Sequence, residues 1–196
     1  MKVTLLGNCQ MKALTWYIQQ LNLNFDVKYV WTDIGFERFQ GQCAKEDTFG
    51  SRTIPTIVDT QLAKERLSNS NYILYNPIQP SRVKHFNYED IKQYGANSKL
   101  IPIGCFYLNR ESPSSGNLKM RGLMKTKERS EKHNMDIHIH KIIMKYRVDQ
   151  MATHNKYHPK VLYFLELVRE ICTLTGWNYY SDEQYNEYSR QRFPFG

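Results

Sequence analysis

The first 31 residues alternate between segments typical of buried strands and a segment typical of an amphipathic helix, and this alternation most limits the possible folds. Residues 2–6 (KVTLL) and 26–31 (DVKYVW) are short runs of apolar and β-branched residues, which predict strands. Between them, apolar residues recur at Met11, Leu14, Ile18 and Leu21, and this spacing predicts a helix over 10–21. Strands separated by helices indicate βαβ units.

The same alternation continues as far as residue 103. We predict a helix over 60–67, a strand over 71–76, a short helix over 87–94 and a strand over 98–103. Residues 35–53 have no clear periodicity and are predicted to form a loop with a short helix. The predicted fold class is therefore α/β, with a parallel sheet between layers of helices.

After residue 103 the pattern changes. Residues 111–117 (ESPSSGN) predict a flexible loop, and residues 120–151 are mostly polar, cationic and helical in character. We expect a basic, mostly helical insertion or cap at about 110–150 within a single domain spanning 1–196. A last long helix starts at Pro159, buries one apolar face and ends near Gly176, which suits a C-terminal cap.

Composition narrows the classes of partner. Lys and Arg outnumber Asp and Glu by 27 to 19, a net charge of +8, which favours nucleic acid, a membrane surface or a phosphorylated ligand. No apolar run is long enough for a signal peptide or a membrane span, so we expect a cytoplasmic protein. The four cysteines form no CxxC pair and predict free thiols instead of a zinc site or disulfides.

Cys9 lies where the first strand meets the first helix. A helix N-terminus carries unpaired backbone N–H groups and partial positive charge, which lower a thiol pKa and supply oxyanion donors. Ligands of doubly wound sheets bind at the carboxyl ends of the strands, where Cys9 is expected. The alternative is a small buried cysteine that packs a tight turn.

A second candidate group lies in NKYHPK at residues 155–160. Asn155 precedes His158 by three residues, so its side chain can orient the imidazole, and Pro159 suits a helix start. A cysteine, a histidine and an orienting residue form the thiol version of a nucleophile–base–orienter triad. The alternative is that His-Pro is an ordinary signal for a helix start.

Two motifs carry a resemblance to a known family. Gly7-Asn8-Cys9-Gln10 after the first strand, with His158-Pro159 before the last long helix, resembles the WcbI-like family of polysaccharide biosynthesis enzymes. That resemblance implies a coenzyme A-binding acetyltransferase that acts on a sugar or glycan acceptor.

More distantly, the layout is similar to SGNH esterases and acyltransferases, which implies a flavodoxin-like sheet. Their Gly-Asp-Ser block matches residues 7–9, and their Asp-x-x-His-Pro block matches residues 155–159, with Asn155 in place of the aspartate. The middle SGNH blocks, which complete the oxyanion hole, have no clean counterpart. By position, Asn76 and Gln79 are the candidates for this role.

The residues indicate acyl chemistry at a thiol, and the resemblance implies an acyltransferase that moves an acyl group, expected to be acetyl, from coenzyme A to a sugar hydroxyl or amine. Cys9 and His158 are the expected catalytic residues, either through an acyl-cysteine or by direct transfer with His158 as the base. Arg110, Lys119 and Arg121 are the expected contacts for the coenzyme A phosphates.

Two rival functions stay open. An SGNH-like hydrolase would use the same site with water as the acceptor. A non-enzymatic nucleic-acid-binding protein would use the positive charge, but the sequence has no RNA-binding signature or zinc-finger spacing, which disfavours nucleic acid. His138 and His140 could be a pair of ligands, but nothing in the sequence completes a metal site, so none is predicted. The oligomeric state is not predicted.

Overall fold

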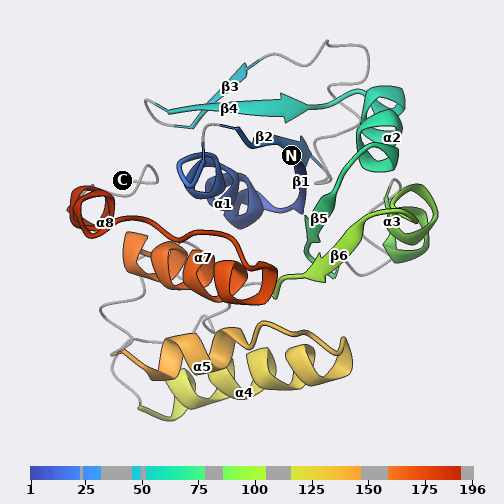
Figure 1. Ribbon diagram of the computed structural model, residues 1–196. Helices are drawn as coiled ribbons and strands as arrows, with labels where there is room; N and C mark the ends of the chain where they lie inside the picture. The colour runs from blue at the N-terminus through green and yellow to red at the C-terminus, as the bar shows by residue number, and fades with distance from the viewer. Residues whose placement is uncertain are drawn as a thin grey trace. The chain divides into compact units, whose positions relative to one another are not determined.

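The computed structural model describes residues 1–22, 24–31, 46–49, 52–77, 86–104, 116–146 and 159–190. The chain forms two compact units, Met1–Ile103 and Gly104–Gly196. All strands in the described part belong to the first unit, and α4, α5, α7 and α8 belong to the second (Figure 1). The single domain with an insertion at about 110–150 stays a prediction.

The first unit contains a six-stranded sheet in the order β3-β4-β2-β1-β5-β6. The strands β4, β2, β1, β5 and β6 run parallel, and β3 pairs with β4 in the antiparallel direction. The predicted α/β class with a parallel sheet is thus confirmed. The strand bounds are β1 (Lys2–Gly7), β2 (Asp26–Trp31), β3 (Glu46–Phe49), β4 (Arg52–Ile57), β5 (Tyr72–Tyr75) and β6 (Lys99–Pro102).

The order of the parallel strands differs from the expected one. Counted along the chain, the five parallel strands are arranged 3-2-1-4-5, which is the Rossmann-type order. A flavodoxin-like sheet, 2-1-3-4-5, would place the third strand beside the first. Here that strand, β4, lies outside β2, so the predicted flavodoxin-like order is wrong in the position of β4. The order β2-β1-β5-β6 of the other four is common to both arrangements.

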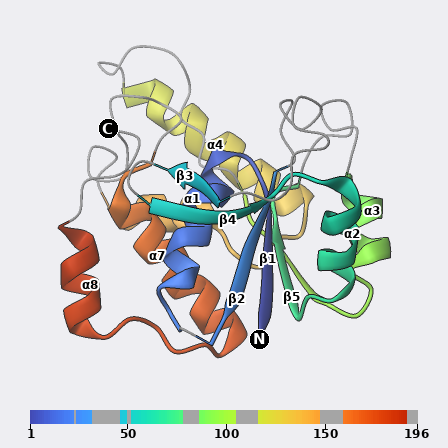
Figure 2. The ribbon, with the colours of Figure 1, turned by 90° about the horizontal axis from the view of Figure 1, so that it is seen from above.

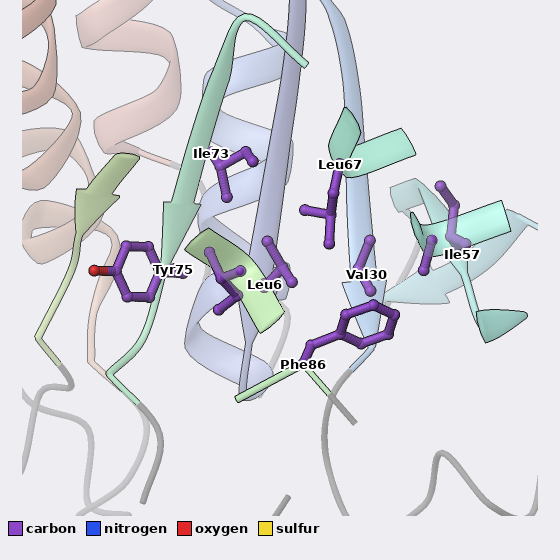
Figure 3. Close-up of a cluster of buried hydrophobic side chains, with 9 residues drawn as sticks. Leu6, Val30, Ile57, Leu67, Ile73, Tyr75 and Phe86 are labelled. Carbon is purple, nitrogen blue, oxygen red and sulfur yellow. The ribbon is translucent and has the colours of Figure 1, made fainter. Parts of the chain in front are cut away.

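Helices cover both faces of this sheet (Figure 2). α1 (Cys9–Gln19) packs against β1, β2 and β4, whereas α2 (Thr60–Ser68) and α3 (Tyr88–Tyr94) contact each other on the opposite face. Strand side chains alternate between faces, so one face of each strand contributes to a shared core. On the α2/α3 face, the buried cluster (Figure 3) consists of Leu6, Val30, Ile57, Ala63, Leu67, Ile73, Tyr75, Phe86 and Ile91.

β3 and the start of β4 fall in the stretch 35–53, which is predicted to form a loop with a short helix, so that prediction is wrong for residues 46–49 and 52–53. The rest of the stretch lies outside the described residues. β3 has the sequence EDTF, and β4 contains Pro55, which lacks a backbone N–H and argues against a strand inside a sheet. Tyr29 pairs with Thr56 and Val30 with Ile57, so β4 is held by partners distant in the sequence.

The second unit is helical in its described part. It contains α4 (Gly116–Lys132), α5 (Ile139–Met144), α7 (Val161–Thr175) and α8 (Asp182–Ser189), each in contact with the next. The predicted helical stretch is therefore two helices, separated by a turn in which Asn134 has a left-handed φ of 45°. No helix in the described residues has the length and apolar character that a membrane crossing requires.

α7 confirms the predicted long helix and its end. Gly176 has a φ of 75° and donates its N–H to the Cys172 carbonyl at 2.8 Å, as a left-handed C-terminal cap does. The start differs, because Lys160 is the N-cap and the helix begins at Val161 and not at Pro159.

Candidate functional site

The turn between β1 and α1 is built around Asn8. Asn8 is the N-cap of α1, and its side-chain oxygen accepts a hydrogen bond from the Gln10 N–H at 3.0 Å. Its carbonyl accepts from the N–H groups of Met11 (2.9 Å) and Lys12 (3.2 Å). Cys9 is the first helical residue and is half-buried, so its predicted position at the strand–helix junction is confirmed.

Because Gly7 has no side chain, the side chains of Asn76 and Met11 can lie against its backbone. Its φ is 143°, and a Cβ atom added there would lie 2.3 Å from Oδ1 of Asn76 and 2.8 Å from Cγ of Met11. Both the positive φ and the contact select glycine at this position. The glycine of the GNCQ motif is thus required by the local geometry of the turn.

Asn76 is the residue against which Gly7 packs. It follows β5, is 3 % exposed, and its N–H donates to the Leu6 carbonyl at 3.1 Å. Its side-chain oxygen accepts from the Asn8 N–H at 3.2 Å, and its side-chain nitrogen donates to the Ile103 carbonyl at 2.8 Å. These bonds tie the ends of β1 and β5 to the segment after β6. These hydrogen bonds stabilise the turn between β1 and α1. The predicted role of Asn76 in an oxyanion hole stays a prediction.

Tyr29 was not identified from the sequence. It lies in β2 opposite Leu5, is 1 % exposed, and its hydroxyl donates to the Gly7 carbonyl at 2.5 Å. The same hydroxyl lies 3.4 Å from the Asn8 carbonyl. A strand tyrosine carries no local signal for such a role, because the pairing register alone brings it to the turn.

The side chain of Lys12 lies at the same edge of the sheet as the Gly7–Asn8 turn. Trp31, the last residue of β2, pairs with Gly7, and the Lys12 ammonium lies 5.1 Å from the centre of its indole ring. This distance is within the range of a cation–π interaction. Lys12 is only 7 % exposed and lies one helical turn from Cys9. In the sequence, only the spacing of three residues from Cys9 indicates that Lys12 lies near the candidate site.

The turn lies at the point where the sheet topology changes direction. β1 is followed by α1 on one face and leads to β2, whereas β5 is followed by α3 on the other face and leads to β6. The carboxyl ends of β1 and β5 are therefore a topological switch point, where doubly wound sheets bind ligands. Cys9 and Asn76 follow these two strand ends.

The remaining predicted residues are distributed as follows. Gln10 is the second residue of α1 and is buried. Lys119 and Arg121 belong to α4 in the second unit, and their side chains lie outside the described part. His158, Asn155, Gln79 and Arg110 also lie outside the described residues. The structure thus brings together Gly7, Asn8, Cys9, Gln10 and Asn76.

Of the other three cysteines, only Cys172 is described. It is buried in α7, its sulfur lies 3.8 Å from the Asn178 carbonyl, and burial raises the pKa of its thiol to about 12. Cys172 is therefore a neutral packing thiol at physiological pH, in contrast to the half-buried Cys9.

His138 and His140 lie beside each other, with ring centres 5.5 Å apart. Desolvation, followed by the charges of His138, Lys141 and Lys127, lowers the pKa of His140. Within the described ranges, no group of three or more His, Cys, Asp or Glu side chains is arranged to hold a metal ion.

Comparison of the chain with protein-family models, with curated proteins and with solved structures finds no match. The likeness to the WcbI-like family, which depends on two short motifs, stays a prediction.

Proposed function

We propose that the chain is a coenzyme A-dependent acyltransferase whose reactive thiol is Cys9. The observation that carries this proposal is the position of Cys9 as the first residue of α1, half-buried, at the carboxyl end of β1 and beside the switch point. A helix start favours the thiolate, which is the nucleophilic form. Cys172, the other described cysteine, has the opposite environment.

The chemistry has two balanced routes. In the first, the Cys9 thiolate attacks the thioester carbonyl, coenzyme A leaves as a thiolate, and the acceptor hydroxyl or amine then attacks the acyl-cysteine. The acceptor proton passes to His158 and the Cys9 thiolate is released. In the second route, His158 removes the acceptor proton, the acceptor attacks the thioester carbonyl directly, and coenzyme A leaves as a thiolate that can take the proton from His158. Cys9 then only helps to shape the oxyanion site through its backbone N–H.

The donor and the acceptor follow from the resemblance to the WcbI-like family and not from the geometry. Coenzyme A carries phosphates that suit the excess of Lys and Arg, with Arg110, Lys119 and Arg121 as candidate contacts. The acceptor is a sugar or glycan, and the SGNH-like arrangement of Cys9, His158 and Asn155 belongs to the same proposal.

The N–H groups at the start of α1 limit how phosphates are bound. Those of Gln10, Met11 and Lys12 are bonded to Asn8, so they are not available to a pyrophosphate. Phosphate recognition therefore depends on basic side chains, and Lys12, buried at the same edge, is a candidate that the sequence did not suggest.

The test is the mass of the intact protein after incubation with acetyl-coenzyme A, together with release of free coenzyme A. We expect one acetyl group on the wild type and none on Cys9→Ser, with coenzyme A release reduced at least about a hundredfold, since loss of a nucleophile removes the covalent route. Release that continues in Cys9→Ser without an adduct would favour direct transfer.

The rival functions give different results in the same assay. Coenzyme A release at an equal rate with and without any sugar acceptor would identify a hydrolase. Absence of both adduct and release, with no thermal stabilisation by acetyl-coenzyme A, would contradict the proposal. A salt-sensitive shift of nucleic acid in a gel would then favour the nucleic-acid-binding alternative.

A further inference from the structure

The C=O and N–H of the peptide between Gly7 and Asn8 are each hydrogen-bonded to a buried side chain, one from β2 and one from the residue that follows β5. The peptide carbonyl accepts the hydroxyl of Tyr29 at 2.5 Å, and the peptide N–H donates to the side-chain oxygen of Asn76 at 3.2 Å. We propose that Tyr29 and Asn76 form a clamp on this peptide and are positioning residues for Cys9. That role in catalysis depends on the acyltransferase function proposed above.

The clamp begins where the strand ladder of β1 ends. On one side the ladder extends to the pair Gly7 and Trp31, and on the other to Leu6 and Tyr75. Beyond these pairs, backbone partners from β2 and β5 are replaced by the side chains of Tyr29 and Asn76. A trans peptide directs its C=O and N–H in opposite directions. A donor on one side and an acceptor on the other can therefore hold the peptide in one orientation.

Both clamp residues are themselves held. Tyr29 is 1 % exposed and lies in a strand with partners on both sides, β1 and β4. Asn76 is 3 % exposed and bonds the carbonyls of Leu6 and Ile103 in addition to the Asn8 N–H. Rotation of the Gly7–Asn8 peptide would break one buried and one partly buried hydrogen bond at once and leave their partners unsatisfied, which is strongly disfavoured.

Positioning of Cys9 follows because Asn8 is the N-cap of α1. The Asn8 carbonyl receives the Tyr29 hydroxyl at 3.4 Å as well as the N–H groups of Met11 and Lys12. The clamp therefore sets the position of the first helical turn relative to the strand end. The positive end of the Tyr29 O–H dipole partly offsets the negative potential of the Gly7 and Asn8 carbonyl oxygens, which precede Cys9 in the chain, and this favours the thiolate.

The experiment compares Tyr29→Phe and Asn76→Ala with the wild type in the rate of Cys9 alkylation by iodoacetamide across pH 6 to pH 10. Tyr29→Phe removes the hydroxyl donor of the clamp, and Asn76→Ala removes both side-chain hydrogen bonds of Asn76. Alkylation at neutral pH is therefore expected to slow by about three- to tenfold in Tyr29→Phe and by at least as much in Asn76→Ala. In Tyr29→Phe the midpoint of the pH profile should also move to higher pH. The double variant should be less impaired than the product of the two single effects, because both residues hold one peptide.

Tyr72→Phe is the matched control. It removes a tyrosine hydroxyl from the same sheet, but Tyr72 is the first residue of β5 and pairs with Val3 at the other end of the ladder. Its alkylation rate and pH midpoint should equal those of the wild type. A Tyr29→Phe profile that coincides with that of Tyr72→Phe would overturn the proposal, even if its melting temperature were lower.

A measurement on the unaltered protein keeps the test independent of folding in the variants. A clamped Asn8 N–H should exchange with solvent deuterium as slowly as the amides of β1, and fast exchange would contradict the clamp. A measurement of acyl transfer distinguishes a failure of the clamp from a failure of the proposed acyltransferase function. Slowed alkylation in a protein that transfers no acyl group supports the clamp and refutes the acyltransferase, whereas transfer with unchanged alkylation in both variants does the reverse.

Discussion

Among the individual residues, the two described cysteines have opposite environments. Cys9 is half-buried at a helix start, whereas burial raises the pKa of Cys172 to about 12, so Cys172 is protonated at neutral pH. We expect limited iodoacetamide at pH 7 to modify Cys9 before the other three cysteines, because the thiolate is the reactive form. Mass mapping of the labelled peptides measures this order.

Cys9→Ser is the control for this labelling experiment and should lose the fastest-reacting site without a change in the slower ones. Preferential modification of Cys43, Cys105 or Cys172 in the wild type would remove Cys9 from the role of reactive thiol.

Among the described residues, the glycines with positive φ are Gly7 and Gly176, and they allow a comparison at the same scale. Gly7→Ala introduces a Cβ atom 2.3 Å from Oδ1 of Asn76, whereas a Cβ at Gly176 meets nothing within 4 Å. Both variants incur backbone strain from a positive φ, about 1–2 kcal/mol at Gly176, which is near the αL region, and about 1–3 kcal/mol at Gly7, which lies outside it. Gly7→Ala adds a buried collision and should lose about 2–4 kcal/mol in the free energy of unfolding, measured in urea. Equal losses in the two variants would contradict the close approach.

At the scale of secondary-structure elements, α2 is joined to the start of the sheet by Arg66. Its guanidinium donates to Oγ1 of Thr4 (2.9 Å), to the Val3 carbonyl (3.2 Å) and to the Asp26 carboxylate (2.5 Å). Partial burial by itself raises the pKa of Asp26, but the hydrogen bond and charge of Arg66 outweigh it, and the pKa is lowered below its usual value. A lowered folded-state pKa means that the ion pair stabilises the fold above the unfolded-state pKa.

That stabilisation should disappear as the pH falls through the folded-state pKa of Asp26. Because the Asp26 side chain is 45 % exposed, Asp26→Asn should cost only about 0.5–1 kcal/mol at pH 7. The difference from the wild type should shrink toward zero at pH values well below the usual carboxyl pKa of about 3.9. Urea unfolding at several pH values measures it. A difference that is constant with pH would indicate that the charge of Asp26 has no part in stability.

The start of α7 allows a test of whether His158 acts in catalysis or only in structure. Lys160 is the N-cap and the helix begins at Val161, so the N-cap position that the sequence suggested near His158 belongs to Lys160. His158→Asn should therefore leave the melting temperature nearly unchanged, yet reduce acyl transfer at least about a hundredfold, the lower end for loss of a general base. Steady-state kinetics and thermal melting measure the two effects.

His154→Asn is the matched control, because His154 lacks the Asn three residues upstream and the proline that follows His158. It should keep most of its transfer activity. If His154→Asn abolished transfer and His158→Asn preserved it, the alignment of the second motif would be wrong.

At the scale of the whole molecule, the net charge of +8 predicts how the donor binds. Part of the affinity for coenzyme A should come from Lys and Arg, so it should fall as ionic strength rises and screens these charges. Dephospho-coenzyme A should bind more weakly than coenzyme A if the 3′-phosphate is recognised. Titration calorimetry with both ligands at several salt concentrations measures this. Equal affinities that are flat with salt would remove the basic residues from the donor site.

Local sequence signals determined most of the elements in this chain. β2 has the predicted bounds, and β1, α1, α2, α3, β5 and β6 begin and end within two residues of prediction. These elements have strong local causes, such as the N-cap oxygen of Asp59 and the capping box of Asn87 with Asp90. The position of Cys9 could likewise be predicted from local sequence, because a strand, a glycine turn and a helix start are all encoded within ten residues.

The tertiary structure decided the strand order and the support of the turn. β4 lies beside β2 because strand pairing joins segments far apart in the chain, and a strand with a proline gives no local sign of its partner. Tyr29 in β2 and Asn76 just after β5 reach one peptide, although 47 residues separate them in the sequence. Periodicity shows which face of a strand is apolar, but only the register of the sheet determines which side chain reaches which backbone group, since hydrogen bonds depend on distances in space.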